Sequence, residues 1–293
     1  MTAPPRPGGL MPPHAGPLPE ARSGAGGVRV VGSVRYAGVP GFRPLEMDLY
    51  LPPEGFGRPV PAVVFLHGGG WLVGSRNAAG PAFAGASPTP FERVALAGIA
   101  VASIDYRLSG EATWPAALHD AKAAVRWLRT RGPEAGLDPT RIAAWGESAG
   151  GHLAALLGLT SDFEGGVGIT GVSSAVKTVV CWYAPSDLAT VPTDPDAPDS
   201  REALFLGAPV SAVPERAAEA SPITYAGEHA PPFLLLHGTA DRLVPAQQSR
   251  RLADALPNVE LELFEDADHM WLGTPEVAET ALNRTIDFLR HHL

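Results

Sequence analysis

The sequence has little cysteine, little positive charge and no long apolar run. Cys181 is the single cysteine among 293 residues, so a disulfide scaffold and a cysteine-rich structural zinc site are both excluded. Asp and Glu number 31 against 22 Lys and Arg, and the formal net charge of −9 argues against nucleic acid or an anionic membrane as a partner. Because no run of about 20 apolar residues occurs, no transmembrane helix is expected.

Glycine and proline, in contrast, are abundant and gather at the start of the chain. They make up 13 of the first 27 residues, where large apolar side chains are few. Such a stretch buries too little surface to offset the ordering of its backbone, so we expect residues 1–27 to be a disordered leader. It lacks the basic start and the apolar run of about 7 to 15 residues typical of a secretory signal, and we expect a cytoplasmic protein.

Residues 28–293 are predicted to form one α/β domain with a mostly parallel, eight-stranded sheet flanked by helices. The predicted strands are residues 28–36, 45–51, 62–66, 99–105, 141–145, 178–183, 233–237 and 260–264. The predicted helices are residues 115–131, 152–159, 246–256 and 275–293. Alternating strands and helices favour parallel pairing with right-handed crossovers. Residues 185–232 interrupt this alternation, and we interpret them as a small cap or a long loop insertion.

A nucleophile motif of the form G-x-S-x-G occurs at residues 146–150, with Ser148 at its centre. Alone it is weak, because a chain this rich in glycine contains a chance match with a probability of roughly 0.2. A predicted strand before it and a predicted helix after it place Ser148 at the carboxyl end of a central strand, above the positive end of a helix. We interpret Ser148 as a nucleophile; a small residue that permits close packing is the alternative.

A glycine loop, HGGGW, follows the predicted strand 62–66 at residues 67–71. Consecutive glycines let backbone N–H groups approach a ligand, so the amides of Gly69 and Gly70, with that of Ala149, are predicted to form an oxyanion hole. A phosphate loop fits poorly, because the Lys-Ser/Thr ending of a P-loop is missing. His67 is interpreted as structural, holding the turn through a hydrogen bond from its side chain to the backbone.

A serine nucleophile needs a base and a carboxylate that orients the base. Asp241 follows the predicted strand 233–237, and His269 follows the last predicted strand. The order Ser148, Asp241, His269 is typical of α/β-hydrolases, so these residues are the predicted catalytic set. The rival carboxylates are Asp187, Asp266 and Asp268.

Aromatic and sulfur-containing side chains flank these loops. Trp71, Met270 and Trp271 are predicted to bind substrate as walls of a pocket, with Phe83 and Phe91 as further candidates. Plain packing in the core is the alternative for each of the aromatic residues.

The remaining reactive side chains favour no metal site and no cofactor. The nine histidines include no H-E-x-x-H motif. His152 and His237 are interpreted as packed or hydrogen-bonded core groups, and Cys181 as a small core residue.

Taken together, these motifs resemble the small bacterial carboxylesterases of the α/β-hydrolase superfamily, in the feruloyl-esterase-like branch near the hormone-sensitive-lipase family. The shared motifs are HGGGW at residues 67–71, GESAGG at 146–151, and further matches at 105–108, 124–129, 138–142, 220–225, 231–234, 237–241 and 244–245. The resemblance implies ester hydrolysis through an acyl-enzyme, with Ser148 as nucleophile, His269 as base and then acid, and Asp241 as its partner. Residues 76–91 depart from this family, because they are longer and richer in Ala, Gly and Pro than expected after such a loop, and we interpret them as a candidate substrate-facing lid.

The expected function is therefore a serine carboxylesterase acting on small short-chain acyl or aryl esters. Three alternatives stay open: an arylformamidase, an acetyl or feruloyl polysaccharide esterase, and a non-catalytic homologue that binds a ligand. The expected partner is a small-molecule ester, and the protein is expected to be a monomer or a homodimer.

Overall fold

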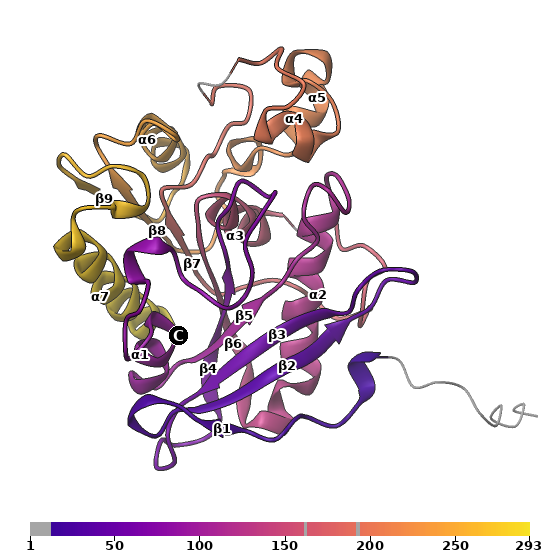
Figure 1. Cartoon of the computed structure of the whole chain (residues 1–293), viewed down its shortest axis with the longest axis vertical. Helices are drawn as coiled ribbons and strands as arrows, with labels where there is room; N and C mark the ends of the chain where they lie inside the picture. The colour runs from indigo at the N-terminus through magenta and orange to yellow at the C-terminus, as the bar shows by residue number, and fades with distance from the viewer. Residues whose placement is uncertain (1–12, 161–162, 192–193) are drawn as a thin grey trace, which may run out of the picture.

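The computed structural model describes residues 13–160, 163–191 and 194–293, and one nine-stranded sheet forms its centre (Figure 1). The strands are β1 (Arg22–Ser23), β2 (Arg29–Ala37), β3 (Leu45–Leu51), β4 (Val60–Leu66), β5 (Ala100–Ile104), β6 (Leu137–Glu147), β7 (Val179–Trp182), β8 (Phe233–Gly238) and β9 (Val259–Phe264). Their order across the sheet is β1-β2-β3-β5-β4-β6-β7-β8-β9. The first three pairings are antiparallel and the other five are parallel, which confirms the predicted mostly parallel sheet.

The predicted number of strands was one too low. Eight strands match the eight apolar runs, and the ninth, β1, is only two residues long. It pairs with β2, so Arg22 lies opposite Val30 although both β1 residues are exposed. Backbone hydrogen bonding forms this strand, and a search for apolar runs therefore overlooks it.

Residues 13–27, the described part of the expected disordered leader, are hydrogen-bonded to the domain. The amide of Ala25 donates a hydrogen bond to the Glu92 carboxylate over 2.9 Å, and the Arg131 guanidinium donates to the carbonyl oxygens of His14 and Gly16. Side chains of the domain therefore supply the partners that this segment cannot supply for itself. Residues 1–12 of the expected leader lie outside the described residues.

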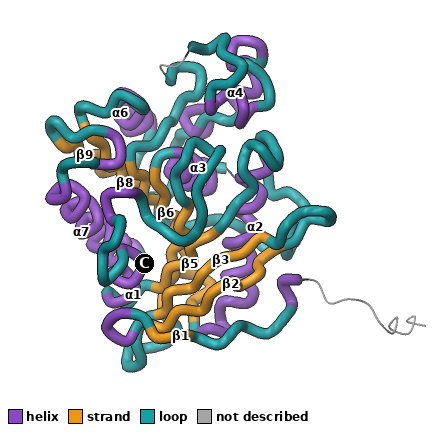
Figure 2. The backbone as a smooth tube through the Cα atoms, viewed as in Figure 1, coloured by secondary structure: helices purple, strands orange, loops and turns teal. Residues whose placement is uncertain are grey.

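Helices cover both faces of the sheet. They are α1 (Pro90–Leu96), α2 (Ala116–Arg131), α3 (Ala149–Leu159), α4 (Arg201–Leu206), α5 (Pro214–Glu219), α6 (Gln247–Ala255) and α7 (Pro275–His292). The apolar side chains of α2, α3 and α6 join the core on one face, and those of α1 and α7 join the core on the other. Figure 2 shows the orange strands between α1 and α7 on one side and α2 on the other.

The alternation of side chains along the central strands explains these two cores. In β4, Val63 and Phe65 pack with α1 and α7, whereas Val64 and Leu66 pack with α2 and α3. Side chains on successive residues of a strand point to opposite faces, so a continuous apolar run is buried on both. This is why the parallel strands were recognisable as short unbroken apolar segments.

The four long helices were predicted, and three short ones were not. The missed helices α1, α4 and α5 have 7, 6 and 6 residues, which is too short for a helical repeat of apolar residues to show. Helices α4 and α5 lie within residues 185–232 and stand at the top of the view in Figure 1, beyond α3. Within the described residues, no helix has the length and apolarity needed to cross a membrane.

Candidate active site

Ser148 lies on a tight turn between β6 and α3. Its φ angle is 51°, a left-handed value that costs a residue with a side chain about 1 to 3 kcal/mol. A Cβ atom on Gly146 would lie 2.2 Å from the carbonyl oxygen of Gly150, and one on Gly150 would lie 2.0 Å from that of Leu66. Only glycine fits at these two positions, so the flanking glycines of the motif let the chain turn sharply and leave Ser148 half-buried at the end of the strand.

Three side chains from separate loops meet at this turn. His269, in the short 3-10 helix after β9, lies with Nε2 3.0 Å from Oγ of Ser148. Its Nδ1 lies 2.6 Å from Oδ2 of Asp241, which follows β8. The structure thus brings the three predicted residues together in one chain of hydrogen bonds, because the loops after parallel strands collect at one edge of the sheet.

Asp241 is held by more groups than His269. Its Oδ1 accepts hydrogen bonds from the amides of Leu243 and Val244, at 2.9 and 2.8 Å. Burial alone would raise the pKa of Asp241, but the hydrogen bonds from His237 and His269 outweigh it and hold that pKa well below its usual range. The carboxylate is therefore charged at neutral pH and oriented on both oxygens.

The role of His237 was not predicted. Its Nε2 lies 3.2 Å from Oδ2 of Asp241 and 2.8 Å from the carbonyl oxygen of Val244, and its Nδ1 lies 2.7 Å from Oγ of Ser249. A carbonyl only accepts, so Nε2 carries the proton and also donates to Asp241. His237 is a hydrogen-bonded core group, as expected, and it positions the carboxylate. The sequence signal that could have indicated this contact is that Asp241 follows His237 by four residues.

The rival aspartates make other contacts. Asp187 pairs with Arg251 at 2.9 Å, and Oδ1 of Asp268 accepts from the His269 amide at 2.7 Å. The backbone amide of Asp266 donates to Oγ1 of Thr239. Among the described residues, Asp241 is the carboxylate that is hydrogen-bonded to the His269 ring.

The glycine loop after β4 presents backbone amides next to Ser148. The φ angles of Gly69 and Gly70 are 111° and 61°, and the Gly69 carbonyl accepts from the amides of Leu72 and Val73. Among the described residues no group accepts a hydrogen bond from the Gly69 or Gly70 amide. Ala149 opens α3, where the first N–H groups of a helix have no partner within it. The three predicted amides are thus available to an anion.

His67 has the hydrogen bond that was expected of it. Its Nδ1 lies 2.8 Å from the carbonyl oxygen of Gly68, and its ring stacks on Tyr106 with centroids 4.3 Å apart. Burial lowers the pKa of His67, so the ring is neutral at pH 7. It supports the loop, and the Ser148 hydroxyl is hydrogen-bonded to His269 instead.

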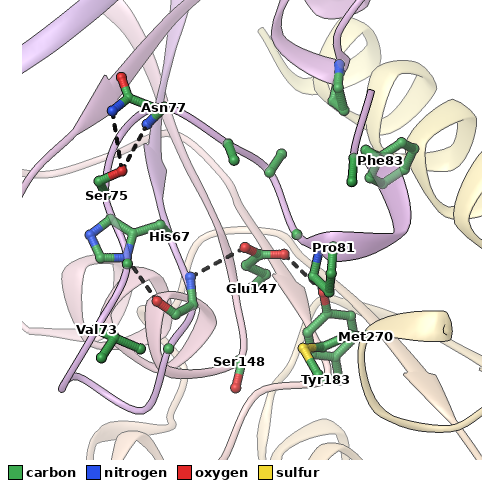
Figure 3. A pocket seen from close by; sticks show the side chains of 18 of the residues that line it. His67, Val73, Ser75, Asn77, Pro81, Phe83, Glu147, Ser148, Tyr183 and Met270 are labelled. Atoms are coloured by element: carbon green, nitrogen blue, oxygen red, sulfur yellow. Dashed lines mark hydrogen bonds between the residues drawn. The ribbon is translucent and has the colours of Figure 1, made fainter. Parts of the chain in front are cut away.

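Glu147 is a functional candidate that the sequence reasoning missed. Its Oε1 accepts from the Gly68 amide at 3.3 Å, and its Oε2 accepts from the Tyr183 hydroxyl at 2.9 Å. The backbone of Gly80 donates a further hydrogen bond to this carboxyl, and burial raises the pKa of Glu147. Figure 3 shows Glu147 between the loop that carries His67 and the Tyr183 ring. One buried side chain therefore joins the glycine loop, the Ser148 turn and the longer loop that follows.

A cavity of about 820 Å³ opens beside Ser148 and His269. Most of its wall comes from residues 67–91, and the rest from side chains on separate loops. The predicted lining residues Met270, Phe83 and Phe91 are part of the wall. The polar or charged side chains in the wall are His67, Ser75, Asn77, Thr89, Glu147, Ser148, Tyr183, Arg201 and His269.

Trp71 and Trp271, predicted as pocket walls, do not line the cavity; both are buried at 2% and 1% exposure. Trp71 stacks on Phe205 of α4 and donates from Nε1 to Nδ1 of His152 over 3.3 Å. Trp271 packs on Trp182 with ring centroids 4.8 Å apart. Their position next to the catalytic loops in sequence was informative, but it did not reveal which way each side chain points.

His152 and Cys181 are core groups, as expected. The His152 Nε2 lies 2.7 Å from the Ala220 carbonyl oxygen, and burial lowers the pKa of His152 to about 4. The Cys181 thiol donates to the Gly151 carbonyl oxygen, and burial raises its pKa far above the usual range. In the part of the chain that the structure describes, no three His, Cys, Asp or Glu side chains are grouped as metal ligands.

The chain is similar to a known protein family and to proteins that are named as esterases. A model of the BD-FAE family matches residues 47–256. Esterase LipC of Mycobacterium tuberculosis is 34% identical over 204 residues, which cover 68% of this chain and 49% of LipC. The probable carboxylic ester hydrolase LipM of the same organism is 33% identical over 233 residues, covering 76% of this chain and 52% of LipM. The chain thus spans about half the length of the curated relatives it matches.

Solved structures resemble the chain over most of its length. A truncated form of a carbohydrate esterase from gut microbiota has a TM-score of 0.78 and 28% identity, covering 92% of this chain and 99% of that one. Propionate-bound esterase 2 of Thermogutta terrifontis has a TM-score of 0.72 and 28% identity, covering 91% of this chain and 94% of that one. The likeness therefore extends to the whole arrangement of sheet and helices.

Proposed function

The chain belongs to the BD-FAE family, and we propose that it is a serine carboxylesterase that hydrolyses small short-chain acyl or aryl esters through an acyl-enzyme. The predicted α/β-hydrolase fold and the predicted relationship to the feruloyl-esterase-like branch are confirmed by the family match and by the similar structures. One observation carries the proposal: Oγ of Ser148 lies 3.0 Å from Nε2 of His269, and both side chains line a cavity.

The first half of the reaction acylates Ser148. Nε2 of His269 takes the hydroxyl proton while Oγ forms a bond to the carbonyl carbon of the ester, and the carbonyl π electrons move to its oxygen. The amides of Gly69, Gly70 and Ala149 donate to this oxyanion, and each such donor lowers the barrier by about 3 kcal/mol. When the carbonyl re-forms, the bond to the alcohol oxygen breaks, and His269 returns its proton to that oxygen.

The second half releases the acid. A water molecule gives its proton to Nε2 of His269, and its oxygen attacks the acyl carbon. The same amides hold the second oxyanion, and its collapse breaks the bond to Oγ of Ser148, which regains a proton from His269. Asp241 keeps the proton on Nδ1 through its 2.6 Å hydrogen bond, so Nε2 starts each half with a free lone pair.

The cavity supports a small and partly apolar substrate. Its volume of about 820 Å³ suits a drug-sized molecule, and alanine, leucine, valine and phenylalanine side chains form much of its wall. A carbohydrate ester is a second candidate substrate, because one similar structure is described as a carbohydrate esterase. Comparing kcat/KM on acetylated sugars and on aryl acetates separates the two.

The decisive variant is Ser148→Ala, assayed with 4-nitrophenyl acetate and butyrate. We expect kcat to fall by about 10⁴-fold or more, because only the oxyanion donors and substrate binding would remain. Ser173→Ala, on an exposed loop outside the cavity, is the matched control. A fluorophosphonate probe should label the wild type and Ser173→Ala but not Ser148→Ala. Wild-type turnover by Ser148→Ala would refute the assignment, and an unlabelled wild type would favour a ligand-binding protein.

A further inference from the structure

Arg201 lies directly beside the glycine loop and lines the cavity. It is the first residue of α4, and its side chain lies across Gly70. A Cβ atom on Gly70 would lie 2.5 Å from Cδ of Arg201 and 3.2 Å from its Nε. A charged group from the segment 185–232 therefore borders the loop whose amides are the proposed oxyanion donors.

The base of this side chain is fixed by α4. Oγ of Ser200 accepts from the Ala203 amide and caps the helix. Phe205 is buried and stacks on Trp71 with ring centroids 4.6 Å apart. The carbonyl oxygen of Phe205 also accepts a hydrogen bond from the Trp114 amide at 2.8 Å. Because Trp71 directly follows Gly70, these contacts set the distance between α4 and the glycine loop.

Arg201 is exposed to solvent where it lines the cavity. Among the described residues no group forms a hydrogen bond or an ion pair with the Arg201 guanidinium. Arg76, in contrast, pairs with the carboxylates of Asp48 and Asp105. The cavity wall contains one carboxyl group, that of Glu147, and both of its oxygens already accept hydrogen bonds. Exposed apolar side chains also line the wall, with Val73 60% exposed and Leu243 44% exposed.

We propose that Arg201 binds a carboxylate on the substrate, so that the preferred esters carry an anionic group in addition to the ester that reacts. This inference rests on the proposed esterase function and names its substrate class. A guanidinium presents a planar fork of N–H donors that matches a carboxylate in geometry and charge. The apolar wall holds the hydrocarbon part between the carboxylate at Arg201 and the ester carbonyl at Ser148.

Two matched pairs of esters test the proposal. On the acyl side, 4-nitrophenyl pentanoate is compared with mono(4-nitrophenyl) glutarate, which has the same number of acyl carbons and a terminal carboxylate. On the alcohol side, phenyl acetate is compared with 4-acetoxybenzoate. The measured quantity is the ratio of kcat/KM for the anionic ester to that for the neutral ester, at pH 7 and low ionic strength.

We expect Arg201→Gln to lower this ratio about tenfold for at least one pair, and Arg201→Lys to restore part of it. Arg250→Gln is the control, because Arg250 is an exposed arginine of α6 outside the cavity and its loss changes the net charge equally. The ratio should stay at the wild-type value in this control.

Two results would overturn the proposal. If Arg201→Gln leaves kcat/KM unchanged on the neutral and the anionic ester of both pairs, the guanidinium does not contact the substrate. An equal loss on the neutral and the anionic esters, which leaves the ratio unchanged, would mean that Arg201 stabilises the oxyanion instead. Failure of the wild type to hydrolyse the neutral esters would instead count against the esterase function, so the two failures are distinguishable.

Discussion

The two sides of the cavity are built in different ways. The reactive side, made of Ser148, Asp241, His269 and the glycine loop 67–70, sits at strand ends and is densely hydrogen-bonded. The substrate side, made of residues 72–91 and Arg201, comes from long connections, and its Leu72 and Val73 are 40% and 60% exposed. The sheet fixes where the chemistry happens, whereas connections that the sheet does not position decide which molecule reaches it.

The substrate side is nevertheless anchored at both ends of its first segment. Arg76 bonds to the carboxylates of Asp48 and Asp105, and its carbonyl oxygen accepts from Oγ of Ser103 at 2.7 Å. At the other end, Thr89 and Glu92 form a reciprocal cap at the start of α1. Between these anchors, the backbone of Gly80 donates a hydrogen bond to Glu147, which also accepts one from the Gly68 amide. Glu147 therefore connects the substrate side to the reactive side.

After Ser148→Ala, the largest effect is expected from Asp241→Asn, which is also on the reactive side. The amide can present its NH₂ group to His269, which would favour the tautomer that lacks a lone pair on Nε2, so kcat should fall by about 10³- to 10⁴-fold. Steady-state kinetics with 4-nitrophenyl butyrate measures it. Asp187→Asn, which removes a carboxylate paired with Arg251 instead, should keep most of the activity. A comparable loss in both variants would contradict the role of Asp241.

A smaller effect is expected where the two sides meet, from Glu147→Gln. The amide keeps one acceptor, but its NH₂ group cannot accept the hydrogen bonds from Tyr183 and the backbone of Gly80. The glycine loop should lose part of its support, and kcat should fall about tenfold with little change in KM. A change in KM alone would show that Glu147 shapes only the substrate side.

The same variant changes how stability depends on pH. Burial raises the pKa of Glu147, so the folded protein holds this proton more tightly than the unfolded chain. That contribution to stability is fully present below the unfolded pKa and is lost as the pH rises through the folded pKa. Urea unfolding across pH should show this loss in the wild type and not in Glu147→Gln. Parallel curves for the two proteins would exclude the titration of Glu147.

The smallest effect is expected on the substrate side, from Val73→Ser. Because this side chain is largely exposed at the rim, its loss should raise KM for 4-nitrophenyl butyrate by about twofold to threefold and leave kcat unaltered. Val172→Ser, outside the cavity, is the control. A large fall in kcat would mean that the two sides are less independent than the structure indicates.

The sequence predicted the reactive side well and the substrate side poorly. Apolar runs located the eight longer strands, and the rule that loops gather at the carboxyl edge of parallel strands brought Ser148, Asp241 and His269 together. The contact of His237 with Asp241 depends on how the loop after β8 folds back on that strand, and the burial of Trp271 depends on side-chain direction in a short irregular turn. No periodicity specifies that direction, and the short helix α4, which carries Arg201, left no pattern either.

The burial of the tryptophans, among them Trp71 and Trp271, has a consequence for the fluorescence of the protein. All six tryptophans are buried, and Trp145, Trp182 and Trp271 form a row with successive ring centroids 4.9 and 4.8 Å apart. The carbonyl oxygen of Trp182 accepts a hydrogen bond from the Ser148 amide at 2.8 Å, so this row adjoins the nucleophile. The intrinsic fluorescence of the folded protein should therefore be blue-shifted and should report on the packing behind the reactive serine without any added dye.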